Sequence, residues 1–185
     1  MEIDINQAKI SIGDKYKIFI DGQQTHKASR QLFSLLPVVH LYDLEDDQPR
    51  MTIAKKLSWF KARYDITRWD NNIIEFRTIS FWKPQYQCQV GPDTYTLYGH
   101  KGRKYSVFKN ETQIAWWDKE AVSWFAGDNY KIIADKDVDV DLLISFCLII
   151  DNFRSDDHDG NMFTIDVGNI GFQVRKFDPS WQPKS

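Results

Sequence analysis

Apolar and polar residues alternate along the first two-thirds of the chain, which is the pattern of β-strands with one buried face. In KYKIFIDGQQTHKASR, Tyr16, Ile18 and Ile20 alternate with polar residues and lead into Asp21-Gly22, a pair typical of tight hairpins. Further turns are expected at residues 45–49, at Asn71-Asn72, at residues 99–102, at Asn110-Glu111 and at Gly127-Asp128. Turn signals at roughly 8–12-residue intervals predict an all-β barrel or sandwich.

The run VDVDLLISFCLIIDNF, residues 138–153, breaks this pattern and predicts a helix. Asp137, Asp139 and Asp141 suit the positive end of a helix, and one of them is expected to cap it. From Leu142 to Ile150 nearly every side chain is apolar, so the helix must be buried on all sides. Its length of about 24 Å is short of the ~30 Å bilayer core. We therefore expect a helix enclosed by protein.

A closed β-barrel is a structure that can surround such a helix on all sides. Barrels of about eight strands are filled by their own side chains, whereas wider ones need contents. We therefore predict a mainly β fold: a closed antiparallel barrel of about twelve strands around one hydrophobic C-terminal helix. Residues 1–153 are assigned to the barrel and helix. Residues 154–185 are assigned to the same domain as an extension with one or two short strands, MFTIDV and GFQVRKF.

Three stretches carry a resemblance to a known family: YKIFIDGQQTHKASRQLFSLLPVVHLYD with the hairpin into IAKKL, YTLYGHKGRKYSVFKNETQIAWW, and ADKDVDVDLLISFCLIIDN. Their order resembles the tubby C-terminal-like superfamily, in particular the branch of LURP-one-related proteins and small bacterial relatives. The resemblance covers about Lys15 to Phe153 and implies a closed barrel around a hydrophobic helix. Tubby proteins bind phosphoinositides and phospholipid scramblases are related, so it also implies binding to phospholipid head groups.

Charge and cysteine content exclude several classes of protein. The net charge is -2, so no overall positive field favours nucleic acid, and anion binding must depend on a local patch. Cys88 and Cys147 make neither a disulfide framework nor a zinc site, and Cys147 is expected to be a small buried residue. The start of the chain lacks the pattern of a signal peptide, so a cytoplasmic protein is expected, free or bound peripherally to a membrane.

A set of lysines and arginines is the candidate anion-binding patch. Its members are Lys55, Lys56, Lys61, Arg63, Lys101 and Arg103. If Lys61 and Arg63 share the outer face of one strand, they form part of a groove for phosphate-bearing head groups. The alternative is that these charges only keep the surface soluble.

Other functions have weaker signals. SDDHDGNMFTID, residues 155–166, approximates a calcium loop, but Ser155 and Asp166 replace the usual first Asp and last Glu, so no metal site is predicted. The histidines are scattered and no nucleophile or phosphate-binding motif is present, so neither an enzyme nor a cofactor is expected. The alternative function is a protein-interaction or structural module that uses the C-terminal extension, with a protein partner or as a homodimer.

Overall fold

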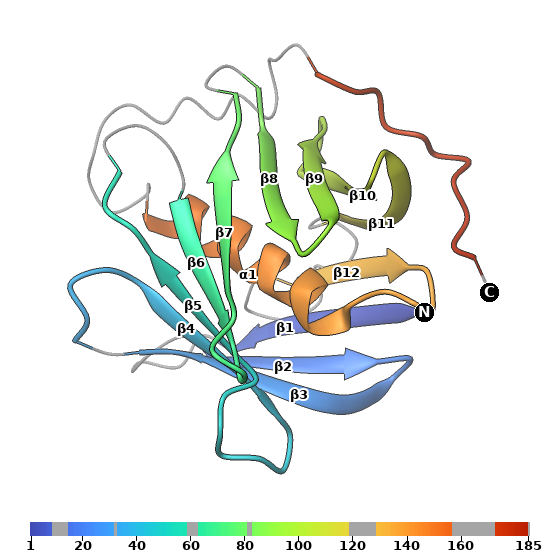
Figure 1. The fold of residues 1–185 in the computed structure, drawn as a ribbon. Helices are drawn as coiled ribbons and strands as arrows, with labels where there is room; N and C mark the ends of the chain where they lie inside the picture. The colour runs from blue at the N-terminus through green and yellow to red at the C-terminus, as the bar shows by residue number, and fades with distance from the viewer. Residues whose placement is uncertain are drawn as a thin grey trace.

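The computed structural model describes residues 1–8, 15–31, 33–58, 63–80, 83–118, 129–156 and 173–184. Within them the chain forms twelve strands and one helix (Figure 1). These are β1 (Glu2–Ala8), β2 (Lys15–Ile20), β3 (Gln23–Arg30), β4 (Val38–Asp43), β5 (Met51–Lys55), β6 (Arg63–Arg68), β7 (Ile73–Thr78), β8 (Gln85–Val90), β9 (Asp93–Gly99), β10 (Lys104–Lys109), β11 (Thr112–Asp118), β12 (Asn129–Ala134) and α1 (Val140–Asp156).

The strands form one closed antiparallel barrel, as predicted. Each strand pairs with the next along the chain, and β1 closes the barrel against β12 with Ile3 opposite Ile132. The Asp21-Gly22 hairpin is confirmed, since both residues have positive φ (49° and 83°), as a tight turn between twisted strands requires. Asn110-Glu111 forms the same kind of turn, whereas Gly127-Asp128 lies outside the described residues.

Helix α1 runs through the inside of the barrel (Figure 1), which confirms the enclosed helix. Every side chain from Leu142 to Ile150 is at most 2% exposed, including Cys147. Asp139 is the N-cap, because its carboxylate accepts a hydrogen bond from the Leu142 backbone N–H at 3.1 Å. At the other end, buried Asp151 accepts hydrogen bonds from the hydroxyls of Tyr16 on β2 and Tyr130 on β12. Arg68 on β6 also donates to Asp139, so the helix is attached to the barrel wall at its start and again at Asp151.

Gly99 on β9 has no room for a side chain, in contrast to Gly22 and Gly91. A Cβ there would lie 2.6 Å from the Cβ and Cγ atoms of Pro84 and 3.0 Å from Cε1 of Tyr105. The Pro84 ring cannot rotate away, so we expect Gly99→Ala to lower the free energy of unfolding by about 2 kcal/mol. Urea denaturation followed by tryptophan fluorescence measures this loss.

The matched control for Gly99→Ala is Gly91→Ala. Gly91 has φ +57° and nothing within 4 Å of an added Cβ, so its replacement carries only backbone strain. That strain is expected to cost about 1 kcal/mol. If Gly99→Ala were no more destabilising than Gly91→Ala, the close approach of Pro84 would not constrain this site.

The C-terminal residues 173–184 lie on the outside of the barrel (red in Figure 1). The strand expected over GFQVRKF is wrong for its described part, because residues 173–177 have an irregular backbone. Their contacts are made by side chains with the outer face of β9–β11, which leaves no backbone ladder to extend the sheet. The other expected strand, MFTIDV, lies outside the described residues.

Candidate functional site

The up-and-down topology gives the barrel two ends with different chemistry. The β2–β3, β4–β5 and β6–β7 turns lie at one end with the start of α1, which we call the N-cap end. The β3–β4, β5–β6, β7–β8 and β9–β10 connections lie at the opposite end. The five candidate basic residues that the structure describes, Lys55, Lys56, Arg63, Lys101 and Arg103, belong to elements at this opposite end.

The structure brings together only part of the predicted basic patch. Lys55 and Lys56 leave the end of β5 beside Arg63 at the start of β6, where the Lys56 N–H donates to the Arg63 carbonyl at 2.8 Å. Lys101 and Arg103 are on the β9–β10 turn, three strand spacings from β6, or about 14 Å. Lys61 lies outside the described residues. Lys101 and Arg103 are therefore not neighbours of the other three.

Two of the grouped cations have carboxylate partners. Lys56 Nζ lies 2.6 Å from an Asp65 carboxylate oxygen, and an Arg63 guanidinium nitrogen lies 2.9 Å from Glu75. Arg63 is also directly opposite Arg77 in the β6–β7 register, and both side chains are exposed. The outer surface here carries mixed charges, with two guanidinium groups side by side at its edge.

Large exposed apolar side chains lie on the connections at the same barrel end as these cations. Phe33 and Leu35 in the β3–β4 connection are 104% exposed, and Leu57, directly after Lys56, is 86% exposed. The Lys55 N–H donates to the Pro37 carbonyl at 2.9 Å, which ties the two connections together. We call this surface the tip and define it as Phe33, Leu35, Lys55, Lys56, Leu57, Arg63 and Arg77.

The apolar members of the tip were not predicted from the sequence. LFSLLP and LSWF have the composition of core segments. Composition alone does not distinguish an apolar cluster that a loop exposes to solvent from one that the loop buries. The outward direction of the Arg77 side chain could be predicted, because Arg77 alternates with the apolar residue Phe76. Its place opposite Arg63 needs the strand register.

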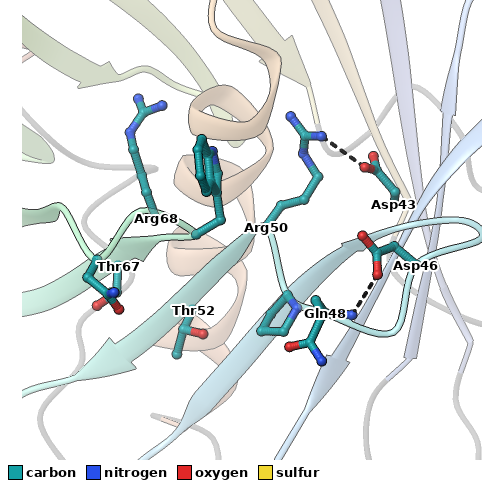
Figure 2. Close-up of a pocket in the computed structure, with 10 residues that line it drawn as sticks. Asp43, Asp46, Gln48, Arg50, Thr52, Thr67 and Arg68 are labelled. Atoms are coloured by element: carbon teal, nitrogen blue, oxygen red, sulfur yellow. Dashed lines mark hydrogen bonds and ion pairs between the residues drawn. The ribbon is translucent and has the colours of Figure 1, made fainter.

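A polar groove of about 580 Å³ opens at the N-cap end (Figure 2). It lies between the β4–β5 and β6–β7 turns. Its lining comprises Asp43, Asp46, Gln48, Pro49, Arg50, Thr52, Thr67, Arg68, Trp69 and Asn71. Arg50 donates to Asp43 at 2.8 Å, the contact drawn in Figure 2, and to Asp141 of α1 at 2.7 Å. Arg68 donates to Asp139, the cap of the helix.

The groove is not suited to an anion, because its cations are already paired. Hydrogen bonds to Asp141 and Asp43 raise the pKa of the Arg50 guanidinium. His26 Nε2 lies 3.2 Å from Asp141 and 3.4 Å from Asp43, on the other side of the same carboxylates. Burial alone would raise the pKa of Asp141, but the hydrogen bonds from His26 and Arg50 outweigh it and lower that pKa. This network fastens the helix start to β3, to β4 and to the β4–β5 turn.

The described residues offer little for covalent or metal chemistry. Burial raises the pKa of the Cys88 thiol to about 12, so it is not a thiolate nucleophile at neutral pH. His40 is a residue of β4, and its Nδ1 contacts Thr52 Oγ1 at 3.1 Å. Across the described ranges no three potential metal ligands cluster. Residues 157–166 of the segment that approximates a calcium loop lie outside these ranges, so the expectation of no metal site there stays a prediction.

No helix within the described residues combines the length and the apolar character needed to cross a bilayer.

A search of curated proteins and a search of solved structures found no match. A comparison with family models matches residues 1–151 to the family described as LURP-one-related. The matched region contains all twelve strands and the buried part of α1. The chain therefore belongs to the LURP-one-related family, a branch of the tubby-like superfamily.

Proposed function

We propose that this protein is a non-enzymatic binding module that attaches to an anionic membrane surface through the tip. The observation that carries the proposal is the exposure of Phe33, Leu35 and Leu57 at the barrel end that holds Lys55 and Lys56. Apolar side chains on connecting segments enter the acyl boundary of a bilayer, while neighbouring ammonium groups stay with the phosphates. A cytoplasmic, peripherally bound protein fits this mode of attachment.

Apolar insertion is expected to contribute more to binding than charge. A lysine or arginine near an anionic leaflet contributes about 1 kcal/mol. Lys56 and Arg63 contribute less than this, because Asp65 and Glu75 already neutralise part of their charge. Arg63 and Arg77 can still hold phosphate oxygens, since the planar guanidinium group makes paired hydrogen bonds with them. The ligand chemistry is thus a phosphate-bearing head group at an apolar boundary.

Vesicle flotation tests the proposal. We expect the protein to float with phosphatidylcholine vesicles that contain phosphatidylserine, and less with phosphatidylcholine alone. Phe33→Ser combined with Leu57→Ser is expected to weaken this partitioning at least about tenfold, because each change removes about 1 kcal/mol or more of apolar transfer. Vesicles that carry phosphatidylinositol phosphates at equal total charge measure any preference for a particular head group.

Ile73→Ser is the matched control. Ile73 is 65% exposed but begins β7 at the N-cap end, so its replacement removes exposed apolar area far from the tip, although less than the double variant removes. Flotation of Ile73→Ser should equal that of the unmodified protein. Failure of the unmodified protein to float with anionic vesicles at low salt would discard the proposal. An equal loss with Ile73→Ser would show that the tip is not the contact surface.

A further inference from the structure

The outer face of β9–β11 is aromatic and covered. Along β9, Tyr95 and Leu97 belong to the interior cluster, so the alternating residues Tyr98 and His100 project outward. They are nevertheless at most 8% exposed. On the neighbouring strands, Phe108 packs edge-on to Tyr98 at 5.4 Å, and Trp116 points away from buried Trp117. We call Tyr98, His100, Phe108 and Trp116 the outer aromatic face.

Residues 173–184, which we call the strap, run across this face (Figure 1). Their exposure alternates: Arg175 and Phe177 are half-buried, whereas Val174, Lys176 and Asp178 are exposed. Both half-buried side chains contact the barrel, Arg175 at the Phe108 ring and Phe177 at the Trp116 ring, so they face it together. The strap thus presents an arginine and an aromatic ring, two residues apart, to the outer aromatic face.

Arg175 contacts both an aromatic ring and a carboxylate. Its guanidinium carbon lies 3.9 Å from the centre of the Phe108 ring and 5.6 Å from that of Tyr98. One of its nitrogens lies 3.3 Å from a Glu111 carboxylate oxygen. Cation–π and ionic contacts together specify arginine at this position, since a planar guanidinium can stack and donate at once.

Phe177 occupies an aromatic notch. Its ring meets Trp116 edge-on at 5.4 Å and His100 at 5.3 Å, and Lys104 Nζ lies 5.5 Å above it. Burial lowers the pKa of His100 to about 4, so its imidazole is neutral at pH 7 and packs as an uncharged ring. The notch therefore selects an aromatic side chain.

We infer that the outer aromatic face is a docking groove for an extended peptide of a partner protein that carries an arginine followed, two residues later, by an aromatic residue. The strap occupies this groove as an intramolecular stand-in for the partner. Glu111 favours a basic residue at the position of Arg175, since its carboxylate holds the guanidinium group at 3.3 Å. Asp135 accepts the Lys184 backbone N–H at 2.6 Å, which holds the end of the strap without selecting a side chain.

Two features make the strap replaceable. It lies outside residues 1–151, which match the family model, and the barrel closes through β1 and β12 without it. It is held by side-chain contacts and by two hydrogen bonds to its backbone, at Arg175 and Lys184. The Arg175–Glu111 pair is solvent-exposed and therefore weak. Its advantage over a partner is tethering, which gives an effective concentration on the order of millimolar.

The test uses the full chain and a fluorescein-labelled peptide with the sequence of residues 173–184. The double variant Arg175→Glu, Phe177→Ser is expected to free the groove and to bind this peptide saturably in fluorescence anisotropy. The unmodified chain should bind it about tenfold more weakly, because a tethered strap near millimolar effective concentration competes with a peptide of about 0.1 mM Kd. Absence of saturable binding to the double variant would overturn the inference.

Two controls separate groove binding from other causes. A peptide that carries the same two changes should bind neither the unmodified chain nor the double variant. If it did bind, the groove would not recognise the arginine and the aromatic residue. Equal peptide binding by the unmodified chain and the double variant would also overturn the inference, since the strap would then not cover the site. The tip variant Phe33→Ser, Leu57→Ser should bind the labelled peptide as weakly as the unmodified chain does, because its strap is intact. This result would separate the groove from the proposed membrane contact.

Discussion

Phe146→Ala is expected to lower the free energy of unfolding by about 3–5 kcal/mol, a large share of the 5–15 kcal/mol typical of a domain. Phe146 is fully buried at the middle of α1, with its ring 5.5 Å from Phe76 on β7 and 6.1 Å from Tyr95 on β9. The barrel is closed by hydrogen bonds all round, so its wall cannot collapse far into the cavity that alanine leaves. Equilibrium denaturation by guanidinium, followed by circular dichroism, measures the loss.

Phe33→Ala is the matched control for Phe146→Ala. It removes the same atoms from a side chain that is fully exposed at the tip, so the change in stability should stay within about 0.5 kcal/mol. A loss below about 1 kcal/mol for Phe146→Ala would contradict tight packing of the helix by the barrel. The two variants together therefore test the enclosed helix rather than a general effect of losing a phenylalanine.

The enclosed helix was predictable because its sequence leaves few alternatives. A segment that is apolar on every side and too short for a bilayer must lie inside protein, and the alternating strands before it supply a barrel. Two strands have weaker signals. β1 carries only Ile3 and Ile5 as regular apolar positions, and β8 reads QYQCQV, in which glutamines separate Tyr86 and Cys88. Their pairing with neighbouring strands, more than their composition, makes them strands.

The candidate sites were less predictable than the fold, because they depend on neighbours that are distant in sequence. Lys55, Lys56 and Arg63 were identified as candidates, but the distance of Lys101 and Arg103 from them follows from strand order. The partners of Trp116 show the same limit. Its outward direction follows from the alternation with Trp117, whereas its contact with Phe177 joins residues 61 positions apart. Only tertiary packing supplies that information.

Asp141→Asn is expected to lower the free energy of unfolding by about 2–3 kcal/mol at neutral pH. Asp141 lies in the first turn of α1 with its side chain 13% exposed, and its carboxylate faces both Arg50 and His26. Removing one partner from a buried ionic network costs about 3–5 kcal/mol, and the 41% exposure of the Arg50 side chain reduces this, since water can solvate the freed guanidinium. Urea denaturation of both proteins measures the difference.

The pH dependence of this difference tests whether charge is its cause. The pKa of Asp141 is lower in the folded protein than in the unfolded chain, so the unfolded chain binds the proton first as the pH falls. The stabilisation is therefore complete above about pH 4, the unfolded value, and is lost below it as the pH passes the folded pKa. Asp47→Asn, at a fully exposed carboxylate of the β4–β5 turn, should change stability by less than about 0.5 kcal/mol. A gap between the unmodified protein and Asp141→Asn that persisted unchanged into strong acid would assign the effect to shape and not to the ionic network.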